Sequence, residues 1–237
     1  MKTYLVHLPK NTDRLASMDR QLKKFGIEYE TMAVIAKDLS KKELHRRVNF
    51  VRSYIAHGRR LSIAEIGCSL SKQVIYRWMV EQNIPYALIL EDDVIFTERV
   101  PEAIGAVEKF LDSNKPQVFF FNGHGIDALR CQQELGIVRE NYAMCTDAYL
   151  VTLETARRLD RINDPLIRVD DDWPKWLRRG VVEVYRYYPV TARQSGLFAS
   201  DLQPYRKKIP LWRRPFHKAL RIVCNGIDAM LYLLTGK

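Results

Sequence analysis

Three consecutive acidic residues, Glu91, Asp92 and Asp93, follow a short apolar run and are the first candidates for chemistry in this sequence. Adjacent carboxylates repel one another, and the repulsion is costly unless a cation or abundant water compensates for it. On an alternating backbone, residues 91 and 93 point the same way, so a hard divalent ion could bridge them and the diphosphate of a ligand. A solvated acidic turn is the alternative, because such triplets are common on protein surfaces.

A second acidic cluster, Asp170, Asp171 and Asp172, stands directly before Trp173. An aromatic ring can stack on the apolar face of a pyranose while neighbouring carboxylates bind its hydroxyls, and one carboxylate can act as a general base. A helix N-terminus would explain the same residues, with Asp172 as the cap and Pro174 in the first turn. The residues alone leave both interpretations open.

A helix of about five turns is predicted near residues 63–82, where apolar residues recur every four positions. Ser62 and Glu65 form a capping box at its start, which gives Glu65 a structural role in its own right. Gly67 lies one turn further on, where glycine costs roughly 1 kcal/mol relative to alanine. We therefore expect another group to approach the backbone at Gly67, and packing by a neighbouring segment is favoured over a nucleotide.

The segments that must position these residues alternate between strands and helices. Apolar runs at 85–90, 118–121 and 148–152 predict buried strands, and the first two end in polar residues. A strand at 3–8 and a helix that stops at Gly26 precede them. Ligands collect at the carboxyl ends of strands in open α/β sheets, so we expect residues 91–93 and the polar cluster 122–125 to share one site. We also expect a strand at 27–34, a helix at 102–111 and a helix at 153–159.

The composition favours a globular protein with an acidic partner. The chain has 237 residues, 47% of them hydrophobic, and a formal net charge of +10, which fits nucleic acid, anionic lipid or a phosphorylated substrate. Nucleic acid is disfavoured because the positive excess is not interleaved with aromatic residues along strands. A metal-dependent phosphotransferase or nuclease is disfavoured because no P-loop or paired His/Asp motif occurs.

The positive charge is concentrated near the C-terminus, where residues 204–221 carry Lys and Arg without any Asp or Glu. Apolar residues follow over 219–234, in a stretch too short and too interrupted to span a bilayer. We expect residues 204–237 to form a basic amphipathic segment that lies on an anionic membrane surface. A C-terminal helix packed back on the domain is the alternative. With no apolar core of a signal peptide at the start, the expected location is the cytoplasmic face of the membrane.

Three stretches form a recognisable set: Val6-His7-Leu8 with Arg14, the block LSIAEIGCSLS at 61–71 and the block ALILEDDV at 87–94. Together they resemble glycosyltransferase family 25 of bacterial lipooligosaccharide synthesis, and the resemblance covers about residues 3–202. Blocks at 146–152, 169–171 and 188–195 are also similar. Two positions depart from the family pattern, because Lys72 and Asp147 stand where the family usually has His.

The resemblance implies a GT-A-like α/β fold, a Rossmann-like mixed sheet flanked by helices, over residues 1–203. The implied reaction is inverting transfer of a hexose, galactose from UDP-galactose, to a hydroxyl of a lipid-linked oligosaccharide of the lipopolysaccharide type. Glucose or an N-acetylhexosamine is the alternative donor sugar. Mn²⁺ or Mg²⁺ would lie on Asp93, assisted by Glu91 or Asp92, and Asp171 would be the base within the cluster that includes Asp170 and Asp172. The donor nucleotide sugar would be flanked by Leu8, Arg14, Ala33, Val34, Glu65, Gly67, Asp92 and Gln194.

Overall fold

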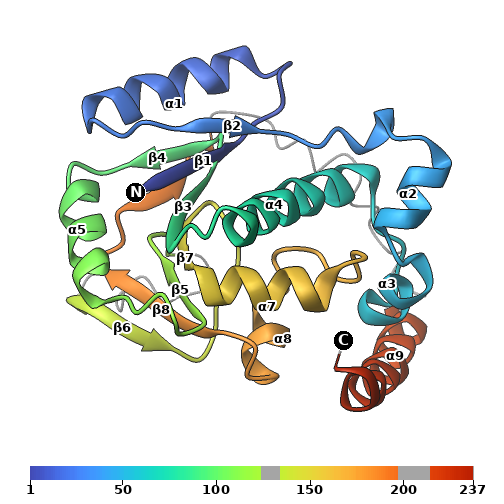
Figure 1. Cartoon of the computed structure of the whole chain (residues 1–237). Helices are drawn as coiled ribbons and strands as arrows, with labels where there is room; N and C mark the ends of the chain where they lie inside the picture. Colours follow the sequence, from blue (N-terminus) through green and yellow to red (C-terminus); the bar gives the residue numbers. More distant parts are fainter. Residues whose placement is uncertain (124–133, 197–213, 237) are drawn as a thin grey trace.

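A seven-stranded mixed β-sheet forms the centre of the computed structural model, which describes residues 1–123, 134–196 and 214–236 (Figure 1). The strands of this sheet and of a smaller one are β1 (Lys2–Val6), β2 (Glu30–Met32), β3 (Tyr86–Glu91), β4 (Val94–Phe96), β5 (Gln117–Phe120), β6 (Gly136–Glu140), β7 (Ala148–Thr152), β8 (Glu183–Tyr188) and β9 (Ala192–Gln194). The order is β2-β1-β3-β7-β5-β8-β6, and β4 pairs with β9 separately. Strands β1, β2, β3, β5 and β8 run in one direction, so their carboxyl ends lie at one edge, whereas β7 and β6 run in the other.

Helices cover both faces of the large sheet (Figure 1). They are α1 (Thr12–Lys24), the 3₁₀ helix η1 (Ala36–Asp38), α2 (Lys41–Arg47), α3 (Phe50–His57), α4 (Ile63–Glu81), α5 (Val100–Phe110), α7 (Leu153–Asn163), α8 (Trp173–Arg178) and α9 (Arg214–Thr235). In β3, Ala87 and Ile89 face α4, α7 and α8, while Leu88 and Leu90 face α1 and α5. The apolar run of β3 is continuous because the strand is buried on both sides. The expected α/β class, with a mixed sheet flanked by helices, is confirmed.

Patterns in the local sequence predicted most of these helices and strands correctly. The Ser62 and Glu65 side chains form the predicted capping box at the start of α4. Gly26, with a φ of 66°, follows the end of α1 in a left-handed conformation that suits glycine. The strand expected at 27–34 is shorter than predicted, since only the three residues of β2 pair with β1.

Helix α9 packs along α3 at one side of the molecule (Figure 1). Cys224 and Asp228 of α9 are buried, whereas Phe216, Leu233 and Leu234 of the same helix are exposed. The described part of the chain contains no helix that is both long and apolar enough to span a membrane. The basic residues at 206–208 and 213 lie outside the described residues. Residues 214–236 are thus docked on the domain, as the alternative interpretation expected, while much of their apolar surface remains open.

Candidate active site

A pocket of about 510 Å³ lies at the carboxyl ends of β1 and β3. Its walls come from the segment after β1, the loop around η1 and the first turns of α4. This volume falls within the range of roughly 300–1,000 Å³ that is usual for small-molecule sites. The pocket is lined by most of the residues predicted for the donor and the metal, namely Leu8, Arg14, Ala33, Val34, Gly67, Glu91, Asp92, Asp93 and Gln194.

The three acidic residues at the end of β3 point to three different sets of partners. Strand β3 ends at Glu91, and Asp92 and Asp93 form a turn. The expectation that residues 91 and 93 share one direction through strand alternation is therefore wrong, because the alternation does not extend past Glu91. Asp92 is fully engaged, since His7 Nδ1 and Arg14 each lie 2.8 Å from one of its carboxylate oxygens.

Asp93 is buried, yet one of its oxygens is left open. Gln194 donates to its Oδ2 at 3.0 Å because the β4–β9 pairing brings Gln194 beside the turn. Its Oδ1 has no hydrogen-bond partner among the residues that the structure describes. Burial, together with the nearby Asp147, raises the pKa of Asp93 above its usual value. An unsatisfied buried carboxylate oxygen is costly, and a bound cation would remove that cost.

A divalent ion at Asp93 fits this donor set. No group of three or more His, Cys, Asp or Glu side chains that could hold a metal occurs among residues 1–123, 134–196 and 214–236. Mg²⁺ is commonly held by only one or two carboxylates, with phosphate oxygens of the substrate completing its shell. The open oxygen of Asp93 in a nucleotide-sized pocket meets that requirement, with the diphosphate supplying the remaining ligands.

Glu91 is paired with Lys72, a lysine with no exposed surface. Lys72 Nζ lies 2.7 Å from Glu91 and 2.9 Å from Asp170, and it also donates to the Thr146 hydroxyl. Burial alone would lower the pKa of Lys72, but Asp170 and Glu91 raise it well above its usual value, so the side chain stays charged. Glu91 is therefore in close contact with a cation that it shares with Asp170, whereas Arg14 lies 3.8 Å from Asp93. Burial nevertheless raises the pKa of Glu91 to about 7.

Thr146 joins the two acidic clusters, which are about 80 positions apart in the chain. Its hydroxyl lies 2.8 Å from Glu91 and 2.9 Å from Asp171, and it can donate its one proton to either of them. Lys72 contacts both clusters as well, through Glu91 and Asp170. The tertiary structure thus places the proposed base cluster next to the acids at the end of β3.

The members of the second cluster have distinct environments. Asp170 accepts a hydrogen bond from Tyr76 at 3.2 Å besides its ion pair with Lys72. Asp172 is bound by Arg168. Asp171 is the exposed member, and its described hydrogen bond comes from the neutral Thr146 hydroxyl. Asp171 is consequently the carboxylate of this cluster that can reach a ligand in solution.

The predicted sugar-stacking role of Trp173 is wrong. The indole ring is fully buried and packs edge-on against Phe120 and Tyr149 in the core. The helix interpretation holds in part, because Asp172 is the N-cap position of α8 and Pro174 lies in the first turn. The Asp172 carboxylate, however, makes no capping hydrogen bond and goes to Arg168 instead.

Gly67 and Glu65 have structural explanations. A Cβ at Gly67 would lie 2.9 Å from the carbonyl oxygen of Val34, so only glycine allows the pocket loop to approach α4 this closely. Glu65 does not line the pocket, which corrects its assignment to the donor site. Burial opposes its ionisation, but hydrogen bonds from Arg59 and Ser62 lower its pKa to about 2.

The polar cluster 122–125 after β5 was expected to share the pocket with residues 91–93, but the residues of this cluster that the structure describes do not line it. Asn122 is buried and accepts a hydrogen bond from Arg186 at 3.0 Å, and it does not line the pocket. Residues 124 and 125 of this cluster lie outside the described residues. Sequence reasoning also missed Thr146 and the role of Lys72, although Lys72 shares the apolar stripe of α4 with Ile75 and Met79.

Comparisons with known proteins agree on one family. The family model described as "Glycosyltransferase family 25 (LPS biosynthesis protein)" matches residues 1–173. A glycosyltransferase 25 family member of Drosophila melanogaster is 28% identical over 186 residues, which cover 73% of this chain and 30% of that protein. Procollagen galactosyltransferase 1-A of Xenopus laevis is 24% identical over 229 residues, 91% of this chain and 36% of that protein. The chain therefore spans about a third of the length of these relatives.

Among solved structures, the chain is similar to a glycosyltransferase involved in glycosylation of the major capsid of PBCV-1. The TM-score is 0.33 and the sequence identity 12%, with 68% of this chain and 66% of that chain covered.

Proposed function

The chain belongs to glycosyltransferase family 25, and from this premise we propose that it transfers galactose from UDP-galactose, with inversion, to a hydroxyl of a lipid-linked oligosaccharide. The observation that carries the proposal is the junction at Thr146, where the acids of a nucleotide-sized pocket meet a second, exposed carboxylate. A transferase needs such a junction, because the donor's anomeric carbon and the acceptor hydroxyl must meet. The galactosyltransferase names of the relatives support the choice of sugar.

On the donor side, the protein positions a diphosphate with its own charges. Arg14 lines the pocket and lies 2.8 Å from Asp92 and 3.8 Å from Asp93, so it fixes the turn that carries both acids. A divalent ion held at the open oxygen of Asp93 would neutralise the leaving UDP. The pocket wall at Val34, close to Gly67, would flank the nucleotide.

On the acceptor side, Asp171 takes the proton from the attacking hydroxyl. Asp170 and Asp172 are each paired with a buried cation, Lys72 and Arg168, which occupies their oxygens. Burial raises the pKa of both carboxyls despite these cations. Asp171 remains as an exposed carboxylate beside Thr146. In an inverting transfer, the base acts on the hydroxyl that attacks opposite the leaving group, so its proper place is next to the donor pocket rather than inside it.

The donor is tested by thermal unfolding with a panel of UDP- and GDP-sugars in the presence of Mn²⁺. A ligand that binds only the native state stabilises it by RT ln(1 + [L]/Kd), which is about 2.7 kcal/mol at a hundredfold excess over Kd. We expect UDP-galactose to give the largest rise in melting temperature and GDP-sugars to give none. A preference for GDP-sugars, or no rise with any UDP-sugar, would overturn the donor assignment, and a larger rise with UDP-glucose would change the sugar.

For the location, we propose that the open side of α9 rests on an anionic membrane at the cytoplasmic face. Phe216, Met230, Leu233 and Leu234 are more than half exposed, and Lys218 on the same helix is exposed as well. Apolar side chains that enter the lipid interface next to cationic ones are typical of interfacial helices. The basic residues that precede α9 would add about 1 kcal/mol each near an anionic surface.

Sedimentation with anionic and neutral vesicles tests this location. We expect the full chain to pellet with anionic vesicles, less so at high salt. The double variant Leu233→Ser, Leu234→Ser should bind at least about tenfold more weakly, since burial of one leucine contributes about 2 kcal/mol and tenfold corresponds to about 1.4 kcal/mol. Leu135→Ser is the matched control, because Leu135 is 75% exposed but lies in another part of the fold. Equal loss in both variants, or no pelleting of the wild type, would refute the proposal.

A further inference from the structure

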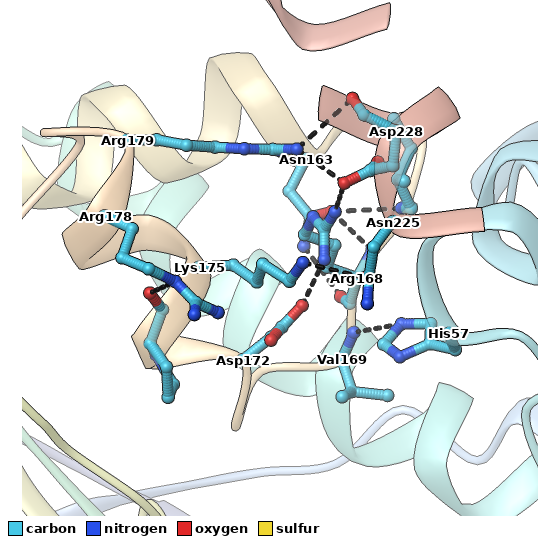
Figure 2. A network of polar contacts seen from close by, with 12 residues as sticks. His57, Asn163, Arg168, Val169, Asp172, Lys175, Arg178, Arg179, Asn225 and Asp228 are labelled. Carbon is cyan, nitrogen blue, oxygen red and sulfur yellow. Dashed lines mark hydrogen bonds and ion pairs between the residues drawn. The ribbon is translucent and has the colours of Figure 1, made fainter. Parts of the chain in front are cut away.

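Arg168 is a buried cation held between two carboxylates from distant parts of the chain (Figure 2). Its guanidinium donates to Asp172, in the acidic cluster, and to Asp228, on α9. None of the three side chains is freely hydrated, since Arg168 and Asp228 are at most 1% exposed and the Asp172 side chain is 20% exposed. Arg168 therefore connects the C-terminal helix directly to the segment that holds the proposed base.

Hydrogen bonds to side chains elsewhere in the fold hold the backbone amides of residues 167–170. Asn163 Oδ1 accepts hydrogen bonds from the amides of residues 167 and 168, at 3.0 and 2.9 Å. The amide of Val169 donates to His57 Nε2 at 3.3 Å, and the amide of Asp170 donates to Ser69 at 3.2 Å. Burial and the charge of Arg168 lower the pKa of His57 to about 4, so the ring is neutral and can accept. Beyond Asp170, the described side-chain contacts of the segment are the hydrogen bond from Thr146 to Asp171 and the contact between Arg168 and Asp172.

Asp228 holds two arginines with different surroundings. Arg179 donates to Asp228 at 2.5 Å and stacks over the ring of Tyr232 on the same helix, with 4.1 Å between its guanidinium carbon and the ring centroid. Arg179 thus fastens α9 to the domain without a described contact to Asp172. Arg168 is the member that continues from Asp228 to the acidic cluster (Figure 2).

We propose that Asp228 and Arg168 are positioning residues for sugar transfer, and that α9 acts through them to orient the segment 170–172. This inference rests on the proposed function, because it takes Asp171 as the base. With Asp228 in place, the Arg168 guanidinium donates to two carboxylates and holds the Asp172 side chain in one orientation. The orientation of Asp172 in turn sets the direction of its neighbour Asp171. Without Asp228, the guanidinium is free to turn fully towards Asp172. Helix α9 is in this sense part of the catalytic unit and not a separable tail.

The test compares Asp228→Asn with Arg179→Gln in the full chain. Both variants weaken the attachment of α9, so both should lower the melting temperature. Asp228→Asn should also lower kcat by about tenfold or more, with the KM for the donor changed less than about twofold, since small displacements of a reacting group are costly. Arg179→Gln should keep kcat within about twofold of the wild type. Asp228→Glu restores the carboxylate and should recover part of kcat.

A second readout does not depend on activity. Hydrogen exchange of the amides of residues 170–173 should become faster in Asp228→Asn and stay near the wild-type rate in Arg179→Gln. Near-normal kcat and exchange in Asp228→Asn would overturn the inference, as would equal losses of kcat in both variants, which would indicate general docking of α9. If the wild type transferred no sugar, the proposed function would fail, and the exchange data alone would then decide whether Asp228 orders the segment. If Asp228→Asn does not fold, Arg168→Lys against Arg179→Lys tests the same point, because each keeps its charge but loses the guanidinium at Asp228.

Discussion

The Asp93→Asn variant is expected to lose sugar transfer by at least about a hundredfold while keeping its fold. The substitution removes the charge but preserves the shape of the side chain. The lost carboxylate is the one whose Oδ1 has no partner within the described ranges 1–123, 134–196 and 214–236. Without this carboxylate the cation that would neutralise the leaving UDP is lost, and removal of one preorganised group of this kind typically costs about 10²–10³ in rate. Since burial already disfavours the ionised form of Asp93, the melting temperature should stay unchanged or rise.

Turnover is measured against Mn²⁺ concentration, with Glu91→Gln as the matched control. Glu91 lies in the same pocket but pairs with Lys72. The Glu91→Gln variant should therefore have a lower melting temperature and a nearly unchanged half-saturating metal concentration. More than a tenth of wild-type turnover in Asp93→Asn at saturating metal, a loss under about 1.4 kcal/mol, would show that Asp93 is not the metal ligand.

Asp171→Asn is expected to lower kcat by about 10² or more without weakening donor binding. A general base contributes typically 10²–10⁴-fold, and Asp171 is the exposed carboxylate at the junction with the donor pocket. Because Asp171 is bound by a neutral hydroxyl, the amide can keep that contact and the fold should be unaffected. The measurements are kcat with a soluble acceptor and the thermal shift with UDP-galactose.

Asp170→Asn and Asp172→Asn are the neighbouring controls. Each would leave a buried cation with one carboxylate fewer, so each should lower the melting temperature more than Asp171→Asn does. Near-normal turnover in all three variants would exclude the cluster as the source of the base. A loss confined to Asp170→Asn would move the role to that residue.

Short-range patterns were enough to predict the elements that form the pocket. The capping box at Ser62 and the apolar stripe that follows it predict α4, and the run before Glu91 predicts β3. The blocks shared with glycosyltransferase family 25 supplied pocket residues that no pattern could, such as Leu8 and Gln194. These predictions succeeded because a helix cap, a turn or a buried strand depends on residues close by in the chain.

The sequence by itself therefore determined the α/β elements, the pocket at the end of β3 and the identity of its acids. The tertiary structure alone decided which side chains each acid contacts. Asp92 meets His7 and Arg14, Glu91 meets Lys72, and Asp93 keeps an open oxygen because the strand ends before it. The partner of a buried charge is set by the strand order and by the helices that cross the sheet, which bring together residues separated by tens of positions. Burial then makes each such pairing decisive, because an ion removed from water must find a counter-charge in the protein or in a ligand.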